Sequence, residues 1–203
     1  VLTTPEYQPS VKIDMKKKLF PDDYLYLNDT LCIAKIIEPV GNNDYKPSVA
    51  RWNMATGEIN PMPYEYPDLK KVRFIYAASA EHQLYVQCYT QYDLMTICDF
   101  NGNLKCNIYG PKWVNEKTQT QHYSLGVEFC GDKILALYSG GDHRTDAYYP
   151  TKFLVFDLNG NYLKTLETGY MITDFCYDKE NNRLIINLND EIQFAYLDLE
   201  GII

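Results

Sequence analysis

The stretch that decides the fold is Lys152–Thr165, KFLVFDLNGNYLKT. In it, an apolar run leads to Asp157 and then to Gly160, after which a second strand-like run begins. The pair Asn159-Gly160 is a strong hairpin signal, because glycine adopts a positive φ at little cost. The stretch therefore predicts two short antiparallel strands joined by a tight turn.

The same pattern occurs at three other places in the chain. It appears as LMTICDFNGNLK from Leu94, as VARWNMATGEI from Val49 and as IQFAYLDLEGII from Ile192. Upstream of each hairpin lies another pair of short apolar runs separated by a polar turn, such as the pair around Gly131-Asp132. Each unit therefore contains four short strands rich in Val, Ile, Tyr and Phe.

Four-stranded units that repeat about every 40 to 45 residues are typical of β-propeller blades. A β-sandwich has a similar strand spacing but does not repeat one motif four times. We therefore expect an all-β fold, a β-propeller of four-stranded antiparallel blades, with about four blades in this chain. Two insertions lengthen the third unit, Pro111–Tyr123 and Gly140–Thr151.

The two ends of the chain bear on the domain organisation. We expect residues 1–203 to form a single domain. The fourth unit ends at Ile203, where its outer strand begins, and residues 1–13 have the pattern of an outer strand. That strand would close a four-bladed ring and remove exposed sheet edges, or the chain is the C-terminal portion of a larger ring. Because the chain begins with Val1 rather than Met, we expect the second arrangement, in which the parent chain has further N-terminal blades.

The charge of the chain excludes two classes of partner. Among its 203 residues, Lys and Arg number 19 and Asp and Glu number 27, so the formal net charge is −8. Binding to nucleic acid or to an anionic membrane surface requires a basic surface, and no apolar run approaches the roughly 18 residues of a membrane helix. We expect no nucleic-acid partner and no membrane insertion by this chain.

The motifs of common enzyme classes are absent from the sequence. Ser139 lies in LYSGG, where Leu137 stands in place of the first glycine of a nucleophile elbow. The six cysteines show no CxxC spacing, and most lie in apolar runs, so we expect at least four of them to be free and buried and no zinc site. Asp99, Asp157 and Asp198 precede hairpin turns, where a carboxylate accepts turn N–H groups. We expect no catalytic residue, no metal and no cofactor.

The chain contains 19 tyrosines, and many of them fall in the expected connections between strands. By blade topology both insertions emerge on one face, and Tyr and Trp combine a large contact area with a polar tip. The loop around Asp142 either holds a cation or an acidic group, or it is a solvated loop whose charges cancel. We predict that this face binds a protein or a carbohydrate through Trp113, Tyr123, Asp142, His143, Arg144, Tyr148, Tyr149 and Tyr170.

Three stretches of the C-terminal half resemble one known family. They are KILALYSGG from Lys133, KFLVFDLNGNYLK from Lys152, and ITDFCYDKENNRLIINLNDEIQ from Ile172. They are similar to the TolB-like, six-bladed β-propeller-like proteins of the cell envelope of Gram-negative anaerobes. The resemblance implies that the four units are part of a six-bladed ring. It also implies export to the periplasm or cell surface as a lipoprotein, anchored through a residue upstream of Val1.

These observations lead to one expected function and one alternative. We expect a non-enzymatic cell-envelope propeller that binds a protein or a glycan through its Tyr- and Trp-rich loop face. The alternative is a metal-dependent hydrolase or lactonase-like enzyme, since some six-bladed propellers hold a metal ion in the central tunnel. For that role the inner strands supply the carboxylates of Asp22, Asp23, Glu128 and Asp174 but no histidine.

Overall fold

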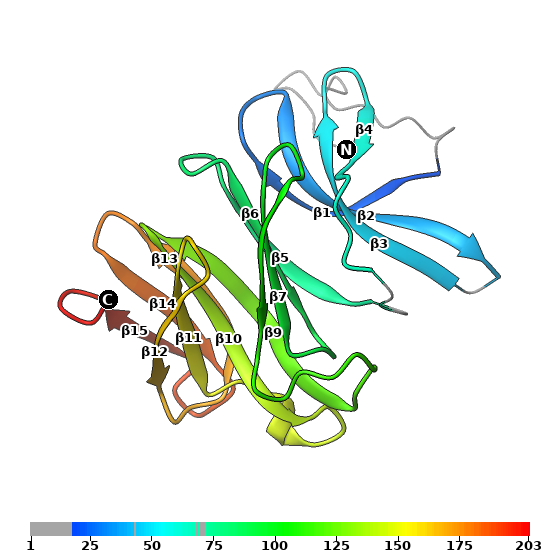
Figure 1. Cartoon of the computed structure of the whole chain (residues 1–203). Coiled ribbons are helices and arrows are strands. Elements are labelled where there is room, and N and C mark those ends of the chain that lie inside the picture. The colour runs from blue at the N-terminus through cyan, green and yellow to red at the C-terminus, as the bar shows by residue number, and fades with distance from the viewer. Residues whose placement is uncertain (1–17, 43, 68, 70–71) are drawn as a thin grey trace. The chain divides into compact units, whose positions relative to one another are not determined.

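The computed structural model describes residues 18–42, 44–67, 69 and 72–203 (Figure 1). These residues form three four-stranded antiparallel sheets, one three-stranded sheet and a single 3-10 turn, η2 (Asp146–Tyr148). The predicted all-β fold with antiparallel, propeller-type blades is thereby confirmed. The stretch 1–13, expected to be an outer strand, lies outside the described residues.

Each sheet is a meander in which consecutive strands are neighbours. The first contains β1 (Phe20–Tyr26), β2 (Leu31–Gly41), β3 (Asp44–Asn53) and β4 (Glu58–Pro61). The second contains β5 (Phe74–Ser79), β6 (Leu84–Tyr89), β7 (Leu94–Asp99) and β8 (Leu104–Tyr109). The third contains β9 (Thr120–Cys130), β10 (Lys133–Asp142), β11 (Lys152–Asp157) and β12 (Tyr162–Glu167). The last contains β13 (Ile172–Asp178), β14 (Arg183–Leu188) and β15 (Phe194–Asp198).

The predicted hairpin turns form as the sequence indicates. Between β11 and β12, Oδ1 of Asp157 accepts hydrogen bonds from the backbone N–H groups of Asn159 and Asn161, at 2.9 and 2.8 Å. Gly160 has a φ of 86°, which is costly for residues with a side chain. The recurring aspartate at this place therefore caps the turn, as expected.

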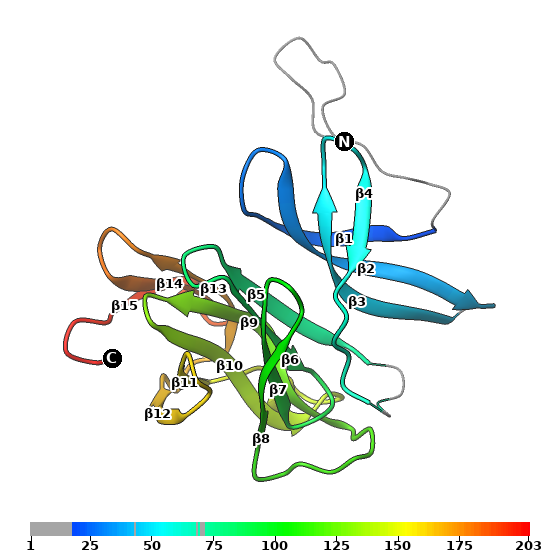
Figure 2. The same ribbon diagram turned by 45° about the horizontal axis from the view of Figure 1, so that its top comes forward.

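Two compact units make up the chain. The first contains the described residues up to Val72 together with Phe100–Asn103. Its β2 and β3 form a long hairpin that continues past β1 and β4 to Gly41 and Asp44 (Figure 2). Its core packs Cys32, Ile36, Trp52 and Ile59.

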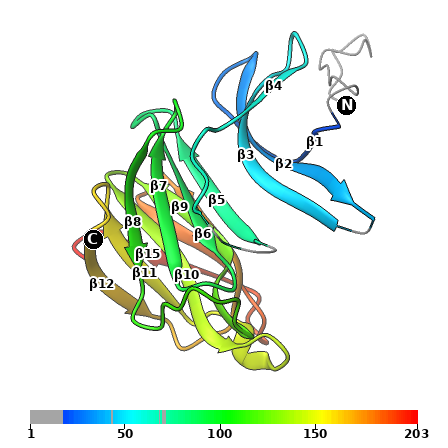
Figure 3. The same ribbon diagram turned by 45° about the vertical axis from the view of Figure 1, so that its right-hand side comes forward.

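The second unit contains Arg73–Asp99 and Leu104–Ile203, and so the other three sheets. Within it, the β5–β8 and β9–β12 sheets lie next to each other (Figure 3). Their facing sides share one apolar core, to which Val86 and Ile97 contribute from one sheet and Ile134 and Ala136 from the other. A second core joins the β9–β12 sheet to the β13–β15 sheet. Three blades are thus packed face to face around buried aliphatic and aromatic side chains.

The structure corrects the bounds of both insertions. Strand β9 begins at Thr120 and β10 ends at Asp142, so residues 120–123 and 140–142, expected in loops, are in fact paired strand. The pairing changes register between Tyr138 and Ala136, opposite Leu125, which has a φ of 67°. This β-bulge lets the hairpin extend beyond the rest of its blade.

All six cysteines are free thiols, and four of them are buried. The buried ones are Cys32, Cys88, Cys98 and Cys130, whereas Cys176 is exposed. The prediction of at least four free, buried thiols is confirmed. As for helices, the described part of the chain contains none with the length and apolar character of a membrane span.

Candidate functional site

The two insertions of the third blade meet at one end of their sheet. Gln121 and Thr120 pair with Gly141 and Asp142, so the segment before β9 and the segment after β10 leave the sheet together. The backbone N–H of His143 donates to the carbonyl of Gln119 at 3.2 Å. The predicted common face of the two insertions is confirmed, and both connections lie at the lower end of the sheets in Figure 1.

Trp113 belongs to a cluster of aromatic rings at the start of the first insertion. Its ring centroid lies 5.2 Å from that of Tyr109 and 6.3 Å from that of Tyr92. The backbone N–H of Trp113 donates to the carbonyl of Gly110 at 3.1 Å, which forms a turn directly after β8. Trp113 is half-buried, so one part of the indole is fixed by packing and another part is open to contact.

The second insertion contains a pair of stacked tyrosines. The rings of Tyr148 and Tyr149 lie 4.2 Å apart at 34°, at the end of η2. The turn is fixed to β10, because Oγ of Ser139 donates to the carbonyl of Ala147 at 2.6 Å. A Cβ on Gly141 would overlap that same carbonyl, so the close approach depends on glycine at this position. Both tyrosines are half-buried and are held on a rigid support.

The charged residues of the second insertion are paired within their own loop. Oδ2 of Asp142 accepts from Nη2 of Arg144 at 2.8 Å, and Oδ1 accepts from the Arg144 backbone N–H and Nε. These hydrogen bonds hold the pKa of the Asp142 carboxyl well below its usual range. Nδ1 of His143 lies 2.9 Å from the carbonyl of Gln119 and donates to it. The arrangement matches the expected alternative of a loop whose charges cancel.

Tyr170 lies in the connection between β12 and β13, beside the end of the second insertion. Backbone hydrogen bonds join Thr168 to Thr151 and Ile172 to Pro150 across this border. Tyr170 is 48% exposed. The structure thus places Tyr170 at the border of the same end of the blade.

Tyr123 is where the structure corrects the expected loop face. It is 1% exposed and pairs with Tyr138 across the β9–β10 ladder, with the rings edge to face at 5.3 Å. The reason is that β9 begins before Tyr123, so the side chain enters the core between the blades instead of a loop. Tyr123 nevertheless lines a pocket between the second and third blades.

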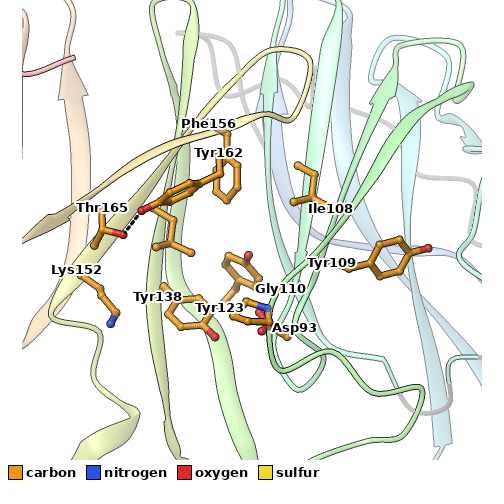
Figure 4. Close-up of a pocket in the computed structure, with 12 residues that line it drawn as sticks. Asp93, Ile108, Tyr109, Gly110, Tyr123, Tyr138, Lys152, Phe156, Tyr162 and Thr165 are labelled. Atoms are coloured by element: carbon orange, nitrogen blue, oxygen red, sulfur yellow. Dashed lines mark hydrogen bonds between the residues drawn. The ribbon is translucent and has the colours of Figure 1, made fainter.

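A pocket of about 350 Å³ lies between the second and third blades (Figure 4). Its walls come from the outer strand β8 on one side and from β11 and β12 on the other, with Tyr123 and Tyr138 behind. Sγ of Cys106 on β8 donates to the carbonyl of Asn159 at 3.3 Å and so connects the two blades. The residues that line the pocket are Asp93, Ile108, Tyr109, Gly110, Pro111, Tyr123, Tyr138, Lys152, Leu154, Phe156, Tyr162 and Thr165.

A buried polar cluster lies at the base of this pocket, and the sequence interpretation missed it. Asp93 is 1% exposed, and its Oδ2 accepts the backbone N–H of Lys112 at 2.9 Å. Its Oδ1 lies 3.7 Å from Nδ1 of His122 and has no hydrogen-bond partner among the described residues. Nδ1 of His122 is also 3.3 Å from the hydroxyl of Tyr138. The three residues come from separate strands and turns, and no local motif joins them.

The protonation of the cluster follows from its burial. Burial lowers the pKa of His122, with the charge of Asp93 acting in the opposite direction, so the imidazole is neutral at pH 7. Burial and the Asp93 charge raise the pKa of Tyr138 far above 10. The hydroxyl of Thr118 lies 3.0 Å from the carbonyl of Gln91 and 3.5 Å from Nε2 of His122. The two ring nitrogens of His122 therefore lie near the hydroxyls of Tyr138 and Thr118.

Two carboxylates of the enzymatic alternative interact within the second unit: burial, followed by the charge of Asp174, raises the pKa of Glu128. Oε2 of Glu128 accepts the backbone N–H of Tyr177 at 2.7 Å. Asp22 pairs with Lys35 at 2.9 Å within the first unit. Among the residues that the structure describes, no three His, Cys, Asp or Glu side chains are placed to hold a metal ion together.

Comparison with known proteins identifies the fold of the chain but does not assign it to a family. No family model matches the chain, and no curated protein matches it. A chain of a Nidogen/Laminin complex is similar at a TM-score of 0.55 and 13% identity, over 89% of this chain and 59% of its own. BamB from Moraxella catarrhalis is similar at 0.51 and 14%, over 85% and 42%. A gluconolactonase from Xanthomonas campestris is similar at 0.51 and 16%, over 83% and 54%.

These similarities show a β-propeller fold. The chain spans about half the length of the propellers that it matches, from 42% to 59%.

Proposed function

We propose that the chain is a non-enzymatic binding propeller that recognises a protein or a carbohydrate through the loop end of its third blade. The observation that carries this proposal is the joining of the two insertions. The hydrogen bond from His143 to Gln119 and a bond from Nζ of Lys112 to the carbonyl of Gly140, at 3.4 Å, connect them. Two aromatic groups, around Trp113 and around Tyr148, are thereby held at one end of a rigid blade.

The chemistry of this loop end supports binding. Half-buried Trp and Tyr rings offer contact area at a small entropy cost, because packing already restricts their rotamers. Arg144, whose side chain is 67% exposed and pairs with Asp142, adds a polar group at the edge. Loops on a rigid β scaffold are a common location of recognition residues.

A second function is not proposed. The similarity to a gluconolactonase concerns the fold and gives no support to a lactonase activity of this chain. In this chain Glu128 is committed to the backbone of Tyr177 in the next blade. That contact gives the best-placed inner-strand carboxylate a structural role.

The proposal extends to the context of the chain. We propose that it is a TolB-like protein of the cell envelope, with these blades forming part of a six-bladed ring whose further blades lie N-terminal to Val1, and with a lipid anchor upstream. The resemblance of the stretches from Lys133, Lys152 and Ile172 supports this. Cell fractionation with an antibody against the chain tests it, and recovery in the cytoplasm contradicts it.

The binding proposal is tested with a glycan array and with cross-linking capture from cell extract followed by purification of the partner. Wild type is compared with Trp113→Ala and Tyr148→Ala, and Tyr196→Ala on β15 serves as an exposed aromatic control. Each loop variant is expected to lose about 1–3 kcal/mol of binding free energy, and the control should bind as wild type does. If both loop variants retain full affinity, the binding site lies elsewhere.

A further inference from the structure

The pocket between β8 and β12 has walls of a particular chemistry. Tyr162, Phe156 and Tyr123 present aromatic rings to it, and Phe156 and Tyr162 meet edge to face at 6.0 Å. Ile108 and Leu154 add aliphatic surface. A pocket of about 350 Å³ is at the small end of the usual range for ligands, about 300–1,000 Å³. It therefore suits one or two rings rather than an extended chain.

Polar groups are distributed around these apolar walls. The hydroxyls of Tyr162 and Thr165 lie 2.8 Å apart on one side, as the dashed line in Figure 4 shows. On the other side, Asp93 brings a carboxylate to the base, and its Oδ1 accepts no hydrogen bond from the described residues. A buried carboxylate oxygen without a donor is costly. A ligand group that donates a hydrogen bond would remove this cost.

The charges around the pocket disfavour a charged ligand. Nζ of Lys152 lies 5.9 Å from the ring centre of Tyr138, where an incoming cation would meet it, and Oε1 of Glu167 is 3.6 Å from that ammonium. An anion would meet the carboxylate of Asp93 at the base. Positive and negative groups are therefore both present, and a neutral ligand whose groups donate and accept fits them best.

We propose that this pocket binds an uncharged sugar ring. One apolar face of a pyranose would lie against the ring of Tyr162, which is 56% exposed. Its hydroxyls would donate to Oδ1 of Asp93 and accept from Nζ of Lys152 or from the hydroxyl of Thr165. The inference rests on the proposed function and deepens it, since it assigns the carbohydrate class of ligand to one particular pocket.

The pocket and the loop end are close neighbours, which links the sugar site to the proposed binding face. Tyr109 and Gly110 line the pocket, and Tyr109 also packs against Trp113. A glycan with one residue in the pocket would continue toward the aromatic cluster of the first insertion. The two places are nevertheless formed by different side chains, so they can be tested separately.

The test uses saturation-transfer difference NMR on the whole chain. The probes are the methyl glycosides of glucose, galactose, mannose and N-acetylglucosamine, with tetramethylammonium and benzoate as cationic and anionic comparisons. The variants are Tyr162→Leu and Thr165→Val. Tyr196→Leu is the matched control, because Tyr196 is an outward tyrosine at 67% exposure on β15, against 56% for Tyr162. Circular dichroism melting confirms that each variant is folded.

We expect at least one methyl glycoside to bind, to bind equally to Tyr196→Leu, and to bind at least tenfold more weakly to Tyr162→Leu. The inference is overturned if no glycoside binds, if neither pocket variant weakens binding, or if tetramethylammonium or benzoate binds more tightly than every glycoside. Trp113→Ala and Tyr148→Ala test the proposed function without altering a residue that lines the pocket. Failure of one proposal is therefore distinguishable from failure of the other.

Discussion

The backbone N–H of Lys112 donates a hydrogen bond of 2.9 Å to Oδ2 of Asp93, and this bond joins two separate loops of the chain. Asp93 lies in the turn between β6 and β7, and Lys112 lies in the first insertion, after β8. The carbonyl of Asp93 also accepts the N–H of Gly110 at 2.8 Å. One buried aspartate therefore determines where the first insertion leaves its blade.

Replacing Asp93 by Ala should loosen this insertion. The N–H of Lys112 would lose its acceptor, and we expect the free energy of unfolding to fall by about 1–3 kcal/mol. Urea unfolding measures the loss, and limited trypsin digestion should cut faster at Lys112 or Lys117. The control is Asp132→Ala, whose carboxylate pairs with Lys133 on the surface and should matter little. Equal stability and equal cleavage of both variants would show that the contact has no anchoring role.

Acid should destabilise the second unit through His122. Because burial lowers its pKa in the folded protein, the unfolded chain takes up a proton near pH 6.5 while the folded chain does not. The free energy of unfolding should therefore decrease as pH falls below about 6.5, by at most about 1.4 kcal/mol per pH unit. His122→Gln should have a shallower dependence.

The pH experiment compares unfolding curves from pH 7 to pH 5. Taking the difference between wild type and His122→Gln removes the effect of Glu128, whose raised pKa gives a dependence of opposite sign. Tyr138→Phe should keep the wild-type slope, because burial rather than the phenol is the main cause of the shift. Parallel curves for wild type and His122→Gln would contradict the assignment.

Thiol alkylation should be selective for one cysteine. Burial raises the pKa of Cys32 to about 11 and that of Cys98 to about 11, so both lack accessible thiolate at pH 8. Cys176 is exposed and should react first with iodoacetamide, as peptide mass spectrometry would show. The fast phase should disappear in Cys176→Ser, and rapid labelling of Cys32 or Cys98 in the native protein would be inconsistent with the fold.

Gly160→Ala should weaken the contact between the second and third blades. A Cβ there would lie 2.7 Å from Sγ of Cys106 and 2.9 Å from Cδ1 of Ile108, in addition to the strain of a φ of 86°. Gly169→Ala is the matched control, since its φ is 74° but nothing lies within 4 Å of the added carbon. We expect Gly160→Ala to be less stable than the control by about 1–3 kcal/mol in thermal unfolding. Similar losses would mean that only backbone strain matters.

Local signals account for what the sequence predicted. The blade hairpins depend on contacts a few residues apart, such as Asp157 with Asn159 and Asn161. Their periodic recurrence was sufficient to predict the propeller blades. The common face of the two insertions also followed, because it depends only on strand order.

Non-local contacts account for what the sequence did not predict. The bulge at Leu125 extends β9, and this is what buries Tyr123. His122 and Tyr138 lie on neighbouring strands of one blade, and Asp93 meets them only because the second blade packs against the third. Asp93 follows Tyr92 in a polar turn that resembles many others, so no pattern distinguishes it. Near this cluster, the sequence offers only the Gly110-Pro111 pair after β8, a dipeptide typical of a turn.

The contact between Asp93 and Gly110 has an evolutionary consequence. A Cβ at position 110 would overlap the carboxylate of Asp93. In diverged relatives the two sites should therefore vary together: lineages that retain the acid should retain the glycine, and a larger residue at 110 should coincide with a smaller one at 93. Such a coupled substitution would also mark where in the family the buried carboxylate, and any selectivity that depends on it, was lost.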